Sequence, residues 1–355
     1  MTFRPNLLPM TVGSLPHRDV ETAWGLMLTH TPELPSWPQL PRRTFLENMY
    51  AQYSERFPGL VLDREQERIW VDREADLSSA LEQLYTAYLE EDLSYGAISG
   101  DYAAGLAALP GERLGQALAI KGHVTGPVSW GLTVTDRNRR PTLYDEVLAD
   151  AIARHLKLKA LWQEQLLRRF NPNTIMFVDE PYMSSFGSAY VSLGREQVIT
   201  LMEEVLDGIL GLKGVHCCGN TDWSILLSTS IDILSLDAYG YAENLALYPE
   251  ELSAFLARGG IIAWGIVPNS PEVEQETVSS LVERLEAGMG RLARKGIPLD
   301  DLLQGALITP ACGLGPRTVV QAERGLALMA GVSAAMRARY FGEETTPTGA
   351  DPEIR

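Results

Sequence analysis

The chain has 355 residues, of which 45% are hydrophobic, and its formal net charge is −16. This length and apolar content suffice for one large α/β domain or two smaller ones. The acidic balance and the lack of a basic arm argue against a nucleic-acid partner. No signal peptide and no apolar run near the roughly 20 residues of a membrane span is found, so we expect a cytoplasmic protein without a membrane partner.

Apolar runs typical of strands alternate with amphipathic helical patterns along the chain, which predicts parallel βαβ construction. One further strand is expected between about residues 60 and 100, where LVLDREQERIWVD resembles a hairpin and DLSYGAIS is ambiguous. The clearest expected strands are residues 10–16, 119–127, 174–181, 213–219, 232–240, 260–268 and 306–313. The expected helices are residues 144–169, 195–210, 249–257, 272–295 and 316–338.

Eight strands followed by helices predict a single (β/α)8 TIM barrel with an inserted hairpin in its N-terminal third. No Gly/Ser-rich or Pro-rich linker divides the chain, so one domain over residues 1–341 is expected. The polar segment 342–355 is expected to be a disordered tail.

Polar side chains stand where the expected strands end. In a (β/α)8 barrel the catalytic groups come from the C-terminal ends of several strands, so these residues should meet in one pocket. The strand-end residues are Ser14, Asp179, Glu180, His216, Cys218, Asp237 and Cys312.

The stretch GVHCCGNTDW, residues 214–223, contains two of the three cysteines. On a strand, His216 and Cys218 share one face and Cys217 faces the other way. Zinc prefers four ligands drawn from imidazole, thiolate and carboxylate. His216, Cys218 and Cys312 therefore form a candidate zinc site, and Asp237 is a candidate fourth ligand.

Plainer interpretations of the same residues are also possible. His-Cys-Cys on a buried strand is often a packed histidine beside small apolar cysteines. The further cysteine, Cys312, at the end of the last expected strand favours a metal site over this interpretation. A disulfide between Cys217 and Cys218 is disfavoured by geometry, and the absence of an export signal favours reduced thiols throughout. The acids of VDEP could cap a turn. His17, after GSLP, is expected at the surface.

Taken in order, six motifs resemble those of the catalytic C-terminal barrel of cobalamin-independent methionine synthase, within the uroporphyrinogen decarboxylase/methionine synthase-like superfamily. The resemblance spans nearly the whole chain, and its most specific parts are the His-x-Cys and Pro-x-Cys-Gly-Leu segments. The motifs are GSLP, GPVS at 126–129, VDEP at 178–181, HCC at 216–218, LSLD at 234–237 and TPACGLGPRT at 309–318.

The resemblance implies a zinc-dependent methyltransferase that forms methionine from homocysteine. His216, Cys218 and Cys312 would be the zinc ligands, and Asp237 stands where the family has a glutamate ligand. The resemblance also implies a site for each end of the amino acid. Val12, Gly13 and Ser14 would hold the substrate carboxylate, and Asp179 with Glu47 would hold its ammonium group.

The chain departs from this family where the methyl donor is concerned. It has no counterpart of the family's N-terminal barrel, Trp130 does not match the folate-facing tryptophan, and Asn269 stands nearest the place of the histidine proton donor. Methyltetrahydrofolate needs a proton on its leaving nitrogen, whereas cobalt(I) leaves a methylated corrinoid without one. A "core" methionine synthase using methylcobalamin or a corrinoid-carrying protein is therefore expected. A coenzyme M methyltransferase, a uroporphyrinogen decarboxylase-like protein and a binding module without turnover are the alternatives.

Overall fold

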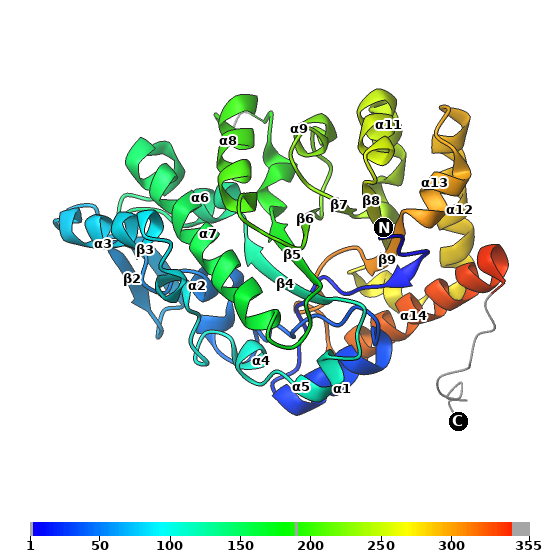
Figure 1. The fold of residues 1–355 in the computed structure, drawn as a ribbon, viewed down its shortest axis with the longest axis horizontal. Helices are drawn as coiled ribbons and strands as arrows, with labels where there is room; N and C mark the ends of the chain where they lie inside the picture. The colour runs from blue at the N-terminus through cyan, green and yellow to red at the C-terminus, as the bar shows by residue number, and fades with distance from the viewer. Residues whose placement is uncertain (1–2, 189–190, 343–355) are drawn as a thin grey trace.

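The structure, a computed structural model, describes residues 3–188 and 191–342. At its centre is a curled sheet of seven parallel strands in the spatial order β1-β9-β8-β7-β6-β5-β4 (Figure 1). Except for Gly342, the tail predicted to be disordered lies outside the described residues. The strands are β1 (Leu8–Pro9), β4 (Ile120–Thr125), β5 (Thr174–Asp179), β6 (Leu212–Cys217), β7 (Ile233–Leu236), β8 (Ile261–Val267) and β9 (Ala306–Pro310).

The expected inserted hairpin is present, as strands β2 (Leu60–Asp63) and β3 (Arg68–Val71) pair antiparallel. The eighth barrel strand expected between about residues 60 and 100 is wrong, because β2 and β3 form a separate sheet and the segment after them is largely helical. Helix α3 (Ser78–Leu89) is followed by the 3-10 helix η2 (Leu93–Gly96). The Asp92 side chain accepts the backbone N–H of the second η2 residue and so starts a helical turn where the apolar run looked extended.

A short extended segment, residues 34–40, lies between β1 and β4. It makes one parallel bridge on each side, Ser14 with Gln39 and Ser36 with Lys121. Among the described residues this segment forms only single bridges and is not a regular strand, so a complete eight-stranded barrel is not established.

The helices pack around the outside of the sheet, with the long helix α7 across β4 and β5 (Figure 1). No helix among the described residues is long and apolar enough to cross a membrane. The longer helices are α1 (Val20–His30), α7 (Glu146–Leu167), α8 (Arg195–Leu206), α11 (Pro249–Ala257), α12 (Val278–Arg294) and α14 (Val319–Phe341). The short helices are α2 (Met49–Gln52), α4 (Ala104–Ala107), α5 (Gly111–Leu114), α6 (Pro127–Thr133), α9 (Trp223–Leu227), α10 (Ala238–Tyr241) and α13 (Leu299–Gln304). The 3-10 helices are η1 (Phe45–Glu47), η3 (Thr142–Tyr144), η4 (Pro181–Ser185), η5 (Ala242–Leu247) and η6 (Pro271–Glu274).

The expected helices are present, but two of them begin later than the sequence pattern indicates. The helix expected over 272–295 is divided, because Thr277 and Ser280 form a capping box that starts α12 after η6. Thr318 and Gln321 form a second capping box at the start of α14. This cap fixes the point where the chain leaves the loop that carries Cys312.

Two apolar cores lie on the two faces of the sheet. The larger one is packed between the sheet and the helices and includes Trp130 and Cys217. The smaller one fills the inside of the curl at the amino ends of the strands, and polar residues follow it toward the carboxyl ends. Its buried members are Leu8, Met10, Leu34, Ala119, Ile175, Phe177, Ile233, Ile261, Ala263 and Leu307.

Candidate metal centre

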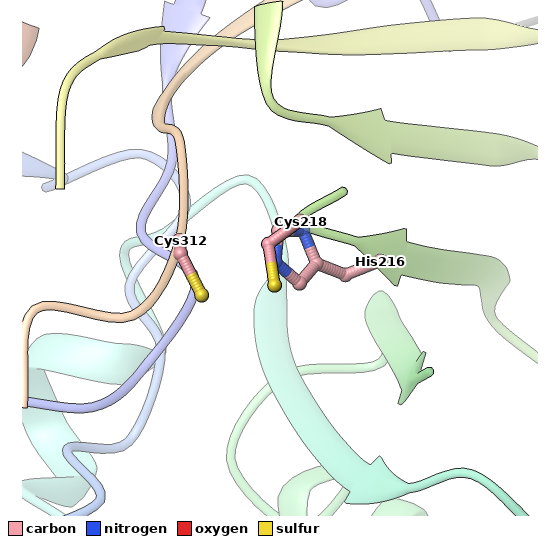
Figure 2. A group of neighbouring side chains, drawn as sticks. All are labelled: His216, Cys218 and Cys312. Carbon is pink, nitrogen blue, oxygen red and sulfur yellow. The ribbon is translucent and has the colours of Figure 1, made fainter. Parts of the chain in front are cut away.

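Three soft donor side chains meet at the carboxyl end of the sheet. His216 lies on β6, Cys218 follows that strand directly, and Cys312 lies in the loop after β9. Their ligand atoms all lie within 4.8 Å of one another (Figure 2). The fold therefore brings together two segments almost a hundred residues apart in the sequence, as the strand-end argument predicts.

The ring of His216 is buried and held in one orientation by a neighbouring strand. Its Nδ1 lies 2.9 Å from the Oγ of Ser235, which is its cross-strand partner on β7. The other nitrogen, Nε2, has no hydrogen-bond partner. Metal-binding histidines commonly show this arrangement, in which one nitrogen is fixed by a polar partner and the other is free for the ion. The sequence did not single out Ser235, although it lies within the LSLD motif.

The two cysteines of the group act on each other's pKa. The hydrogen bond from Cys312 lowers the pKa of Cys218 to about 4, against the opposing effect of burial. The same hydrogen bond, together with burial, raises the pKa of Cys312 well above its usual range. Two cysteine sulfurs and one unpartnered imidazole nitrogen form a donor set that suits zinc. The residues present therefore fit the metal that the sequence predicts.

The loop that carries Cys312 is fixed from two sides. Asn269 donates a hydrogen bond of 2.9 Å from Nδ2 to the carbonyl of Gly313. The backbone N–H of Leu314 donates to the carbonyl of Ser14 at 2.9 Å. A Cβ on Gly313 would lie 2.1 Å from the Ser14 Oγ, so this close approach requires glycine. Asn269 thus has a structural partner beside the candidate centre.

Cys217 faces away from the centre, as its place on the strand predicts. It is buried in the outer core, and its Sγ lies 3.5 Å from the Gly219 carbonyl. Burial raises the pKa of this thiol to about 12. The three cysteines are free thiols.

Asp237 lies near the centre but outside the group of three close ligand atoms. Its Oδ1 accepts the backbone N–H of Gly240 at 2.8 Å and caps α10. Burial raises its pKa, and the negative charge of Cys218 adds to this shift. Its role as fourth ligand stays a prediction.

Two charged side chains, Asp179 and Lys121, lie next to the centre. One oxygen of Asp179, at the end of β5, has no hydrogen-bond partner. Burial raises its pKa, while the charge of Lys121 opposes this shift. Lys121 on β4 is 1% exposed, and its Nζ donates a hydrogen bond of 2.7 Å to the Val12 carbonyl. Lys121 was not predicted as a site residue. Its position on a strand, where alternate side chains point to opposite faces, could have placed it on the inner face of the sheet.

Gly13 and Ser14 present backbone donors beside this pair. Within the described ranges, neither residue's N–H makes a hydrogen bond. Gly13 has φ 138°, a backbone conformation that disfavours other residues, and a Cβ there would lie 2.7 Å from the His123 ring. Unpaired adjacent N–H groups of this kind can bind an anion such as a carboxylate.

Glu47 is fully buried but already has a partner. Its carboxylate forms an ion pair with Arg43 at 2.6 Å, and burial raises its pKa. Its second oxygen has no hydrogen-bond partner. The role of Glu47 in holding the substrate ammonium beside Asp179 stays a prediction.

Glu180 joins the VDEP and GPVS motifs. Its buried carboxylate accepts the backbone N–H of Val128 at 2.8 Å and of Ser129 at 2.7 Å, and the Ser129 hydroxyl at 2.6 Å. These donors lie at the N-terminus of α6, where a negative charge is favoured. Glu180 therefore caps helix α6, which precedes it in the chain. This contact anchors the end of β5 beside Asp179.

The side chains of His17, His123 and Trp130 are all buried. His17 is buried, with Nε2 3.2 Å from Glu323, so its predicted surface position is wrong. His123 is buried and stacked on Trp37 with ring centroids 4.1 Å apart, and burial lowers its pKa well below the usual value. Trp130 is fully buried core.

No protein-family model and no curated protein matches the sequence. Among solved structures, the fold is similar to that of a B12-independent methionine synthase from Shewanella sp. W3-18-1 in complex with selenomethionine. The TM-score is 0.56 and the identity 17%, over 95% of this chain and 100% of that chain. The chain therefore has a methionine synthase-like α/β fold.

Proposed function

We propose that this protein is a zinc-dependent methyltransferase that forms methionine from homocysteine. The observation that carries the proposal is the group His216, Cys218 and Cys312, whose ligand atoms lie within 4.8 Å of one another at the carboxyl end of the sheet. Zinc held by these side chains would keep a substrate thiol deprotonated at neutral pH, and the thiolate is the nucleophilic form.

The surrounding residues support binding of an amino acid beside that group. The free N–H groups of Gly13 and Ser14 would accept the substrate carboxylate, and the unpartnered oxygen of Asp179 would accept its ammonium group. Ser235 holds the His216 ring and Asn269 holds the Cys312 loop, so both sides of the ligand set are kept in place before substrate binds.

We further propose a methylated corrinoid as donor, either methylcobalamin or a corrinoid carried by a partner protein. A folate donor needs a general acid, which is typically worth roughly 10²–10⁴-fold in rate. Asn269 stands nearest that position, but an amide is not an acid near neutral pH and its Nδ2 is already bonded to Gly313. His123 is kept neutral by burial, and His17 lies against Glu323.

The test is a comparison of donors and acceptors with the zinc-loaded protein. We expect methionine from homocysteine and methylcobalamin, and little or none from methyltetrahydrofolate. Free methylcobalamin can be slow if it substitutes for a protein-bound corrinoid. Faster turnover with methyltetrahydrofolate would overturn the donor, and preferred methylation of coenzyme M would overturn the substrate.

The same proposal includes a closed barrel, with residues 34–40 as its eighth strand. The bridges from Ser36 to Lys121 and from Gln39 to Ser14 support this, because they extend the parallel order of the sheet across its two edges. Closure would bring Ser14 and Lys121 to the same pocket as the three donor side chains.

A further inference from the structure

His123 is a buried polar side chain that the proposed chemistry does not use. It lies on β4 and is 1% exposed. Neither of its ring nitrogens has a hydrogen-bond partner among the described residues. A buried polar atom without a partner is destabilising, so an apolar side chain would be the more stable choice at this position. Two such nitrogens on one buried ring therefore need an explanation outside the hydrogen bonds of the folded chain.

The His123 ring is held in a fixed position. It stacks on the Trp37 ring, with centroids 4.1 Å apart and 17° between the planes. Gln163 ties the two residues together, because its Oε1 accepts the Trp37 indole N–H at 2.8 Å and the His123 backbone N–H at 2.9 Å. Its Nε2 donates to the His123 carbonyl at 3.0 Å. All three side chains are buried, so the two ring nitrogens are in place before a ligand binds.

The edge of this ring lies against Gly13. A Cβ on Gly13 would lie 2.7 Å from the His123 Cε1, 3.0 Å from Nδ1 and 3.4 Å from Nε2. The ring thus fills the space that a side chain on Gly13 would need. The backbone N–H groups of Gly13 and Ser14 make no hydrogen bond within the described ranges. Unpaired backbone donors and an unpaired ring therefore lie next to each other.

A carboxylate matches this arrangement. An ionised carboxylate only accepts hydrogen bonds, and its two oxygens can accept from several donors at once. Burial lowers the pKa of His123 well below its usual value, so the ring is neutral at pH 7. A neutral imidazole presents one N–H donor. The ring and the adjacent backbone together can therefore supply a carboxylate with more donors than the backbone alone.

We propose that His123 is a further substrate-binding residue, whose ring N–H donates to the carboxylate of the amino acid beside the backbone N–H groups of Gly13 and Ser14. The inference deepens the proposed function and rests on the proposed location of that carboxylate. A ligand without a carboxylate leaves these buried donors unpaired. Sites built to hydrogen-bond one polar group reject analogues that lack it, so His123 would help the site to select amino acids.

The test is calorimetric binding, which does not require turnover. The zinc-loaded wild type is titrated with L-methionine and with 3-(methylthio)propylamine, which lacks the carboxylate. We expect the amine to bind at least roughly tenfold more weakly, the scale of one lost hydrogen bond to a charged group. His123→Met removes the donor and keeps an apolar side chain. It should weaken L-methionine binding by roughly 10- to 100-fold and leave binding of the amine nearly unchanged. His123→Gln carries a neutral N–H donor and should retain more of the preference than His123→Met.

The matched control is His155→Met. His155 on α7 is also 1% exposed, and its Nδ1 is also unpaired among the described residues. Its Nε2 lies 2.8 Å from the Tyr53 carbonyl, and the Tyr53 hydroxyl donates to the His123 carbonyl, so the control disturbs the same packed group. It should keep the wild-type preference. Near-UV circular dichroism checks that each variant is folded.

Three results would overturn the inference. These are a wild type that binds the two ligands equally or binds neither, a His123→Met variant that keeps the preference, and an equal loss in His155→Met. If the preference depends on His123 but no donor yields methionine, the proposed function fails and this inference stands. Methionine formation with a preference that is independent of His123 would overturn this inference alone.

Discussion

Gly126→Ala tests the contact that ties α6 to the end of β5. A Cβ at Gly126 would lie 2.2 Å from Oε1 of Glu180 and 2.3 Å from its Cδ. The carboxylate cannot move away freely, because it accepts three hydrogen bonds from Val128 and Ser129. Relieving the overlap costs about 1–3 kcal/mol, and loss of one bond to the carboxylate adds roughly 1.5–3 kcal/mol. We expect the free energy of unfolding to fall by about 3 kcal/mol.

Gly194→Ala is the matched control for this prediction. Gly194 is the N-cap of α8 with φ −79° and ψ 151°, close to the φ −75° and ψ 157° of Gly126 at the N-cap of α6. A Cβ at Gly194 would meet nothing within 4 Å. Urea unfolding of both variants therefore isolates the overlap with Glu180. If Gly126→Ala lost less than about 1 kcal/mol relative to the control, the reasoning would be refuted.

By metal analysis the wild type should hold about one zinc per chain, Cys218→Ser and Cys312→Ser should each lose most of it, and Cys217→Ser should keep it. Full zinc content in both Cys218→Ser and Cys312→Ser would overturn the proposed metal site. Asp179→Asn should raise the KM for homocysteine by roughly one to two orders of magnitude in steady-state assays, and an unchanged KM would exclude an ammonium contact. Burial lowers the pKa of Lys159 from 10.5 to about 7. Between these two pH values the unfolded chain binds more protons than the folded chain, so the free energy of unfolding of the wild type rises with pH over this range. Denaturant titrations should show this gain abolished in Lys159→Met, and an identical pH dependence in the two proteins would contradict it.

Much of the fold could be predicted from the sequence, because parallel strands buried on both faces appear as long apolar runs. The strands from β4 to β9 lie where those runs lie. The sheet position between β1 and β4 was missed, because residues 34–40 contain two prolines and form single bridges instead of a ladder. Residues 93–96 looked extended, but the Asp92 cap turns them into a 3-10 helix.

The candidate site was predictable where a residue type alone indicates chemistry, as with His216 and the two cysteines. Residues that act through tertiary contacts were not. Ser235 matters only because the strand register places it against His216, and Lys121 only because its side chain reaches Val12. The ion pair of Glu47 with Arg43 was likewise not predictable, because it depends on how the chain turns between the two residues.

The central claim is that His216, Cys218 and Cys312 hold a metal that activates the substrate thiol. The most direct test is methionine formation from methylcobalamin and homocysteine, measured as zinc is titrated into metal-free protein. We expect product formation to rise in proportion to bound zinc, up to about one ion per chain, and to be abolished in Cys312→Ser. Product formed equally well without zinc, or by Cys312→Ser, would contradict it.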